Sequence, residues 1–253
     1  MGLFRLLYRV PWALFHLVFG LPLTLLSIRF PLRPIRIGGK GLDVIMLNWF
    51  SGTTCTIFGI RRQIHGNFKP GAALVVANHI SWLDIQLLHS ISPMGFVAKA
   101  EINAWPLAGR VAAMGDTVYH QRGSHDSASG VNQAMVEKLQ QGKKVAIFAE
   151  GGILPGDSVK RFHARMFAAA IETDTPVQPV MIRYMRAGQR YPDITFLRGE
   201  GFMGNLLRLL KQGGCTAEVV ILPLVAPAGK RRREIAQASE EAVRAAFEAG
   251  TRA

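Results

Sequence analysis

A histidine and an aspartate stand five positions apart in the segment ALVVANHISWLDIQLLHS, at His79 and Asp84. Five residues of a continuous α-helix turn through about 500°, so these side chains would point about 140° apart and could not touch. They can meet only if His79 lies in a loop and Asp84 lies in the first turn of a helix that begins near Ser81. That contact would fix the imidazole tautomer and leave the second ring nitrogen free to accept a proton.

The same residues also fit a helix-capping motif. With Ser81 at the N-cap, Asp84 would accept a hydrogen bond from a backbone amide, and His79 would be an ordinary polar loop residue. These residues alone therefore leave a proton-transfer site and a helix cap as two open interpretations. No metal is expected, because no histidine pair has the HExxH or HxxxH spacing of a zinc site.

The elements that would position these residues follow from Pro70 onward, where short apolar runs alternate with polar stretches. Strands are predicted at 73–77, 96–99, 117–120, 144–149, 177–182, 194–197 and 217–222. Helices are predicted near 81–90, 105–114, 128–141, 161–173, 202–212 and 234–249. This alternation is typical of an α/β fold with a largely parallel mixed sheet flanked by helices, in which active sites gather at the carboxyl ends of strands.

The first 70 residues combine positive charge with long apolar stretches. The 253-residue chain has a formal net charge of +13, and residues 1–70 hold nine Lys or Arg against one acid, Asp43, a net of +8. Two segments without formal charge, 10–28 and 44–60, lie near the lower length limit for crossing a hydrocarbon core about 30 Å thick. Cations mixed with Leu, Phe, Trp and Val favour an anionic membrane over nucleic acid as the partner.

Both apolar segments are interrupted. Pro11 and Pro22 divide the first, and Asn48 with the polar run 51–54 weakens the second. We therefore expect two helices that lie in one leaflet, while a true span stays open. The alternative is that residues 44–60 form an ordinary buried helix.

Four blocks of the α/β region occur in an order that is found in a known family. NHISWLD resembles the NHxSxxD block of the glycerolipid acyltransferases, the enzymes that acylate glycerol 3-phosphate and lysophosphatidic acid. The segments GDTVYHQR, VAIFAEGG and VQPVMI resemble the second, third and fourth blocks, and FVAKAEINAWPLAG is like the segment between the first two. The likeness covers roughly residues 65–185.

This resemblance implies acyl transfer from a thioester to a hydroxyl group, with His79 and Asp84 as the general base pair. The expected acyl donor is acyl-CoA or acyl-carrier protein, with no bound cofactor and no metal. The resemblance also implies an acyltransferase α/β domain over 63–253, behind a membrane-embedded two-helix appendage over 1–62. We expect the protein at the cytoplasmic face of a bacterial-type inner membrane, where membrane lipids are its partners and nucleic acid is not.

Five further residues are candidates for substrate binding, and three of them, Arg122, Glu150 and Gly151, match family positions. Arg122 ends the second block and suits bidentate capture of a phosphate group. Glu150 is expected to hold the acceptor hydroxyl or to orient a cation, and Gly151 and Gly152 are expected to present backbone amides. Lys99 is a weaker candidate for an anionic group of the acceptor or donor.

The third block departs from the family pattern, and this departure bears on the acceptor. Ala149 stands where the family usually has proline, and Gly152-Ile153 replace the usual Thr followed by Arg or Thr. The run EGGILPGDSVKRFHARMF resembles a bacterial branch that acylates lysophosphatidic acid or lyso-forms of amino-acid lipids such as ornithine lipid.

We expect 1-acylglycerol 3-phosphate as the acceptor, giving phosphatidic acid, with lyso-ornithine lipid as the alternative. A non-catalytic lipid-binding protein is the rival from another class, and the basic composition leaves a nucleic-acid-binding protein as a second rival.

Overall fold

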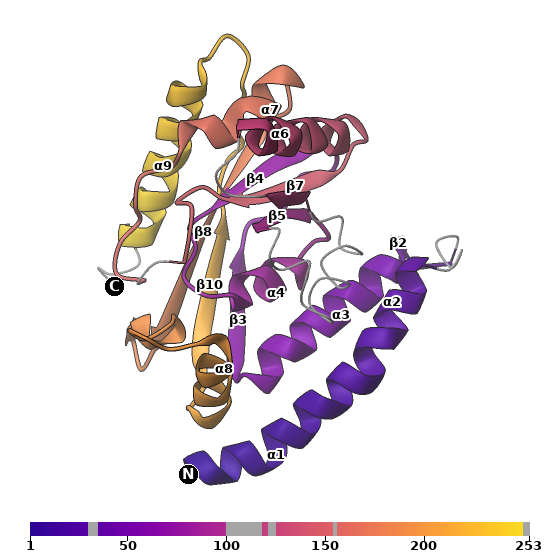
Figure 1. Cartoon of the computed structure of the whole chain (residues 1–253), viewed down its shortest axis with the longest axis vertical. Coiled ribbons are helices and arrows are strands. Elements are labelled where there is room, and N and C mark those ends of the chain that lie inside the picture. Colours follow the sequence, from indigo (N-terminus) through magenta and orange to yellow (C-terminus); the bar gives the residue numbers. More distant parts are fainter. Residues whose placement is uncertain (30–34, 100–117, 121–124, 154–155, 250–253) are drawn as a thin grey trace.

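The computed structural model contains an eight-stranded mixed sheet flanked by helices (Figure 1). The structure describes residues 1–29, 35–99, 118–120, 125–153 and 156–249. The strands are β3 (Ile60–His65), β4 (Ala73–Ala77), β5 (Gly95–Lys99), β6 (Val118–His120), β7 (Lys144–Phe148), β8 (Val177–Arg186), β9 (Gln189–Arg190) and β10 (Cys215–Ile221). Their order is β3-β10-β8-β4-β7-β5-β6, with β9 paired to β8.

The sheet is mostly parallel around its centre, as the sequence predicts. Strand β4 pairs in parallel with β7 and β8, and β5 pairs in parallel with β7 and β6. All five residues of β4, ALVVA, are buried, because a central strand of such a sheet is covered on both faces. Strand β10 is antiparallel to β8 and parallel to β3, so β3 and β10 run opposite to β4, β5, β6, β7 and β8.

Helices cover the sheet and form the N-terminal part of the chain. They are α1 (Gly2–Phe15), the π-helical η1 (His16–Gly20), α2 (Leu21–Arg29), α3 (Leu42–Ile57), α4 (Leu83–His89), α6 (His125–Gln140), α7 (Ala168–Glu172), α8 (Phe202–Lys211) and α9 (Arg232–Ala249). Two short 3-10 helices are η3 (Ala164–Phe167) and η4 (Pro192–Ile194), and a small hairpin joins β1 (Arg36–Ile37) to β2 (Lys40–Gly41). Helix α3 packs against α4 and β3, and α9 packs along β8.

Two predictions about the strands were wrong. Residues 194–197 are not a strand, because Pro192 begins the helical turn η4 and the carbonyl oxygen of Thr195 accepts hydrogen bonds from Asn205 and Arg208 instead of a neighbouring strand. Strand β3 was missed, because only the first residue of its sequence IRRQIH is buried and the strand lacks the apolar pattern of a buried strand. The helix predicted near 105–114 lies outside the described residues.

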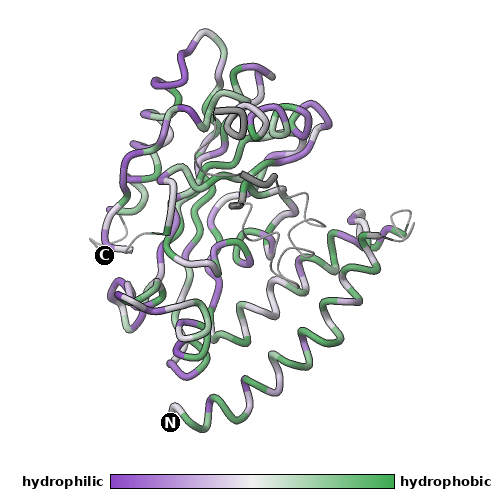
Figure 2. Tube along the Cα trace, viewed as in Figure 1, coloured by the Kyte–Doolittle hydropathy of each residue, from purple (hydrophilic) through white to green (hydrophobic). Residues whose placement is uncertain are grey.

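The two N-terminal apolar segments have different surroundings. Residues Gly2–Ile28 form one helical stretch, and its length and hydropathy would allow it to cross a membrane. Figure 2 shows this stretch as a largely hydrophobic rod at the edge of the molecule. Helix α3 instead buries Ser51, Gly52, Cys55 and Ile57 against the body. Within the described residues, one apolar N-terminal helix is therefore long enough for a span, and a second membrane-embedded helix stays a prediction.

Candidate active site

The residues predicted to do chemistry gather at one edge of the sheet. His79 follows β4 by two residues, and Glu150 follows β7 by two residues. Because β4 and β7 are parallel neighbours, their carboxyl ends lie side by side, as the sequence predicts. Strand β5 ends at Lys99 at the same edge, since it is parallel to β7.

His79 and Asp84 are in contact. His79 lies in the loop after β4, and its Nδ1 atom is 2.9 Å from Oδ2 of Asp84. Helix α4 begins at Leu83 with Trp82 as its N-cap, so the prediction that Ser81 is the N-cap was wrong by one residue. Asp84 nevertheless lies in the first turn of α4, where its carboxylate turns back toward the end of the strand.

The Asp84 carboxylate also organises the loop. Its Oδ2 atom accepts hydrogen bonds from the backbone amides of Ile80 at 2.8 Å and Ser81 at 2.9 Å. Its Oδ1 atom accepts a hydrogen bond from the hydroxyl of Tyr184 at 2.7 Å. The two interpretations of the sequence are therefore compatible, because one carboxylate both fixes the loop backbone and contacts the histidine, and proton transfer stays a prediction.

This arrangement assigns the tautomer of His79. The carboxylate oxygen that faces His79 Nδ1 already accepts two backbone N–H groups and is an acceptor, so Nδ1 must carry the proton in this contact. The other nitrogen, Nε2, then has a lone pair that can accept a proton. The imidazole is 12% exposed, whereas Asp84 is fully buried.

An aromatic ring fixes the plane of the imidazole. Phe148, the last residue of β7, stacks on His79 with ring centroids 3.7 Å apart and an interplanar angle of 9°. Phe96 of β5 stacks on Phe148 in turn, at 5.8 Å and 22°. The stack and the Asp84 contact restrain His79 from two directions, so its Nε2 atom has a defined position.

Glu150 connects two loops at the site. Its Oε2 atom accepts a hydrogen bond from the backbone amide of His79 at 2.8 Å, and its Oε1 atom accepts one from the amide of Lys160 at 2.7 Å. Burial raises the pKa of this carboxyl, and the two amide bonds act in the opposite direction. Glu150 thus positions the backbone of His79. Each oxygen keeps a second lone pair, and contact with an acceptor stays a prediction.

Gly151 and Gly152 differ in their surroundings. Gly151 has a φ angle of +82°, and its amide donates to the carbonyl oxygen of Phe148 at 3.1 Å. A Cβ atom at Gly151 would lie 3.2 Å from the ring of His163, whereas a Cβ atom at Gly152 would meet nothing within 4 Å. The backbone of Gly152 therefore borders open space, which suits the predicted approach of a substrate.

Comparison with known proteins places this geometry in a family. The family profile described as Acyltransferase matches residues 60–183, which include His79, Asp84 and Glu150. The chain is 35% identical over 212 residues to the lyso-ornithine lipid O-acyltransferase of Pseudomonas aeruginosa, and the alignment covers 82% of each chain. The chain belongs to the acyltransferase family. This membership confirms the resemblance in the sequence blocks and identifies the protein as an enzyme.

Two other proteins similar to this acyltransferase cover different fractions of its chain. The chain is 37% identical over 115 residues to the 1-acyl-sn-glycerol-3-phosphate acyltransferase of Neisseria gonorrhoeae, covering 46% of this chain and 45% of that one. The crystal structure of the 1-acyl-sn-glycerophosphate acyltransferase of Thermotoga maritima superimposes with a TM-score of 0.77 at 22% identity, over 98% of this chain and 95% of that one. The structural likeness supports the fold.

Two predicted substrate contacts of the acyltransferase are not visible. Arg122 lies outside the described residues, and the Lys99 side chain does too, although the backbone of Lys99 ends β5. Among the described residues, no group of three His, Cys, Asp or Glu side chains is placed to hold a metal ion. The phosphate and anion contacts assigned to Arg122 and Lys99 therefore stay predictions.

Two contributors to the site of the acyltransferase were missed in the sequence. Asn78 exchanges hydrogen bonds with the backbone of Ile182, donating from Nδ2 and accepting at Oδ1, both at 2.8 Å. Tyr184, two residues further along β8, binds Asp84. The strand was predicted to end at Ile182. Alternation of Val180, Ile182 and Tyr184 on one face was the signal that the strand continues.

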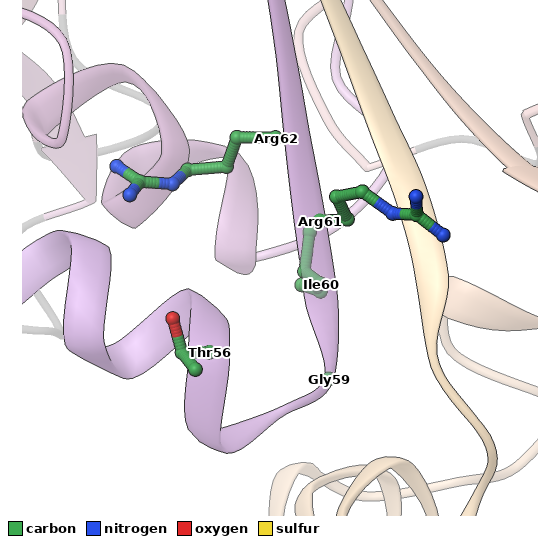
Figure 3. A pocket seen from close by; sticks show the side chains of 5 residues that line it. All are labelled: Thr56, Gly59, Ile60, Arg61 and Arg62. Atoms are coloured by element: carbon green, nitrogen blue, oxygen red, sulfur yellow. The ribbon is translucent and has the colours of Figure 1, made fainter.

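A pocket opens where the polypeptide passes from α3 into β3. It is lined by Thr56, Gly59, Ile60, Arg61 and Arg62, and the two arginine side chains extend to opposite sides of the strand (Figure 3). The Arg62 guanidinium lies against α3, where a Cβ atom at Gly52 would be 2.9 Å from it. Because β3 runs opposite to β4, this pocket lies at the same end of the sheet as His79 but three strands away.

Proposed function

We propose that the enzyme transfers a fatty acyl group from a thioester to the free hydroxyl of a lyso-lipid, with His79 as the general base. The observation that carries this proposal is the 2.9 Å contact between His79 Nδ1 and Asp84 Oδ2, which leaves Nε2 as the proton acceptor. A positioned general base contributes about 10²- to 10⁴-fold in rate. Lipid binding without chemistry would not require this pair.

The proposed reaction follows from the tautomer. Nε2 of His79 removes the proton of the acceptor hydroxyl as its oxygen attacks the thioester carbonyl carbon. Asp84 stabilises the imidazolium that forms, because its charge faces Nδ1 directly. Collapse of the tetrahedral intermediate breaks the carbon–sulfur bond, and the imidazolium returns the proton to the departing thiolate. The products are the acylated lipid and the free thiol of coenzyme A or carrier protein.

The proposed acceptor is lyso-ornithine lipid. The relative that aligns over 82% of this chain is a lyso-ornithine lipid O-acyltransferase, and the enzyme of that name from Brucella abortus is 30% identical over 78% of this chain. The 1-acylglycerol-3-phosphate enzyme of Neisseria gonorrhoeae is similar over 46% of it. The comparisons therefore favour the alternative from the sequence over the phosphate-bearing acceptor, which stays the second candidate.

The N-terminal helix supports a membrane location for the acceptor. Its outward side chains are large and apolar, including Phe15 at 62% exposure and Phe19 at 60%, whereas Arg9 and His16 are buried on its inner side. Arg9 donates hydrogen bonds to the carbonyl oxygens of Leu210 and Gln212, which anchor the helix to the end of α8. We propose that residues 1–62 hold the α/β domain, 63–253, at the cytoplasmic face of the inner membrane.

A panel experiment tests this function. Purified enzyme in detergent is offered lyso-ornithine lipid, 1-acylglycerol 3-phosphate and lysophosphatidylethanolamine, each with acyl-CoA or acyl-carrier protein, and the products are identified by mass. We expect the fastest turnover with lyso-ornithine lipid. Faster turnover of 1-acylglycerol 3-phosphate would replace the proposed acceptor, and binding of these lipids without any turnover would indicate a non-catalytic lipid-binding protein.

His79→Ala tests the mechanism in the same assay. We expect turnover to fall by about 10²- to 10⁴-fold while membrane association is kept. His65→Ala is the matched control, because His65 lies on the exposed edge strand β3 and is 60% exposed. Turnover close to that of the wild type in His79→Ala would overturn the role of the base.

A further inference from the structure

Strand β8 extends past the end of β4 and reaches the catalytic turn. The two strands pair from Leu74 and Val177 to Ala77 and Val180, and β8 then continues to Arg186. In this extension, the backbone of Ile182 pairs with the side chain of Asn78, just before His79. The next side chain on the same face of β8 belongs to Tyr184.

Tyr184 is built into the interior as a hydrogen-bond donor. Tyr184 is 2% exposed, and its hydroxyl is 2.7 Å from Oδ1 of Asp84. Burial, and next the negative charge of Asp84, raise the pKa of this phenol well above its usual value. The hydroxyl therefore keeps its proton, and that proton points at the carboxylate oxygen that His79 does not use.

We propose that Tyr184 is a positioning residue that sets the proton affinity of the His79–Asp84 pair. The proposal rests on the function proposed above, because it requires His79 to act as the base. A carboxylate that accepts a hydrogen bond at Oδ1 concentrates less charge at Oδ2, so it stabilises the imidazolium less strongly. Tyr184 thereby keeps His79 available as a neutral base at lower pH than Asp84 alone would allow.

Other titratable groups around the pair come from four elements. Cys55 of α3 and Cys215 of β10 are buried, and burial raises the pKa of their thiols to about 12 and about 11. Both thiols are therefore neutral near pH 7, and Arg62 of β3, which interacts with Cys55, keeps its charge. Glu150, after β7, faces His79 and Asp84, and its raised pKa makes it the neighbour whose charge can change in acid.

The test is Tyr184→Phe, which removes the hydroxyl and keeps the ring. Without its donor, Asp84 holds the imidazolium more tightly, so His79 loses its proton only at higher pH. We expect the acid limb of the kcat/KM profile to move up by about 0.5 to 1 pH unit. Turnover at the alkaline plateau should stay within about threefold of the wild type, because the base itself is intact.

Tyr191→Phe is the matched control. Tyr191 is also buried, and it also donates its hydroxyl to a side chain, that of Gln212 and not that of Asp84. We expect the acid limb of the kcat/KM profile of Tyr191→Phe to coincide with that of the wild type. A general effect of removing a buried tyrosine hydroxyl would appear in both variants, whereas an effect on the His79–Asp84 pair appears in one.

Two further measurements separate a local effect from a structural one. NMR of 15N-histidine-labelled enzyme, with His79→Gln to assign the signal, should show the His79 ring titrating at higher pH in Tyr184→Phe. In an Asp84→Asn background, Tyr184→Phe should no longer move the acid limb, because the carboxylate that it tunes is absent.

The outcomes distinguish this inference from the proposed function. An inactive His79→Ala variant, together with a Tyr184→Phe profile that overlies the wild type, would overturn the role of Tyr184 and leave the base in place. Full activity in His79→Ala would overturn the proposed function instead. A Tyr184→Phe variant with the wild-type acid limb and a lower plateau would also contradict the proposal, since it would show a structural loss alone.

Discussion

The proposed catalytic turn, residues 78–84, and the N-terminal helix, residues 2–28, relate to their surroundings in opposite ways. In the turn, Asp84 is fully buried and accepts four hydrogen bonds from within the protein. Along the N-terminal helix, large apolar side chains point outward and polar ones such as Arg9 and Thr24 are buried. The hydrogen bonds of Asp84 are all made within the protein, whereas the helix exposes an apolar surface to its surroundings.

Both regions nevertheless use a buried charge in the same manner. Asp84 accepts hydrogen bonds from backbone amides of the loop, and Arg9 donates hydrogen bonds to backbone carbonyls at the end of α8. A buried charge is tolerated when hydrogen bonds replace its water shell. The comparison teaches that hydrogen bonds from within the protein hold both regions, and that the regions differ in the outward face, which is apolar along the N-terminal helix.

The largest expected effect comes from Asp84→Asn. The asparagine oxygen can keep the three donors at Oδ2, and its amide can donate to the Tyr184 oxygen, so the fold is retained. The negative charge beside the imidazolium is lost, and we expect kcat/KM to fall by about 10²- to 10⁴-fold. The melting temperature serves as the control. An active Asp84→Asn enzyme would show that the turn is a structural cap and not a catalytic one.

The double variant Phe15→Ser with Phe19→Ser should have a smaller effect, on membrane binding by the N-terminal helix. The two rings contact each other at 4.8 Å and are both mostly exposed. Transfer of each exposed ring into a bilayer is worth about 1 to 2 kcal/mol, so partition onto anionic vesicles should fall by roughly 30- to 1,000-fold. Turnover in detergent should not change, because these exposed side chains are not part of the proposed site.

The control for the phenylalanine pair is Ile64→Ser with Leu197→Ser. These side chains are 42% and 46% exposed on the α/β body. If the N-terminal helix alone contacts lipid, this double variant should bind vesicles like the wild type. If this control variant lost vesicle binding as strongly as the phenylalanine variant, the membrane surface would extend over the body and the contrast between the two regions would fail.

The parts that could be predicted from the sequence depend on local pattern. The apolar run 73–77 became β4, and the geometry of five helical positions correctly required His79 to lie in a loop. The ordered blocks identified the family. Each of these inferences uses residues within one segment, where periodicity and spacing carry enough information.

The parts that could not be predicted depend on contacts between distant segments. Tyr184 meets Asp84 across 100 residues, and Glu150 meets the backbone of His79 across 71. Nothing in the polar sequence of β3 indicates that β10 will pair with it. The composition of the second apolar segment does not reveal that Cys55 and Ile57 are buried. Tertiary packing, and not local propensity, decides each of these cases.

The smallest expected effect concerns the rigidity of the catalytic edge, through Gly151→Ala. The positive φ angle of Gly151 costs an alanine about 1 to 2 kcal/mol, and its Cβ atom would lie 3.2 Å from the His163 ring. Urea unfolding should show this loss, and Gly152→Ala, with open space around its Cβ position, should unfold like the wild type. Because Glu150 precedes this turn and holds the amide of His79, the strained variant should also lose turnover. Equal stability of the two alanine variants would mean that the loop after β7 adapts to the added methyl group, and that the strain expected at Gly151 is not stored there.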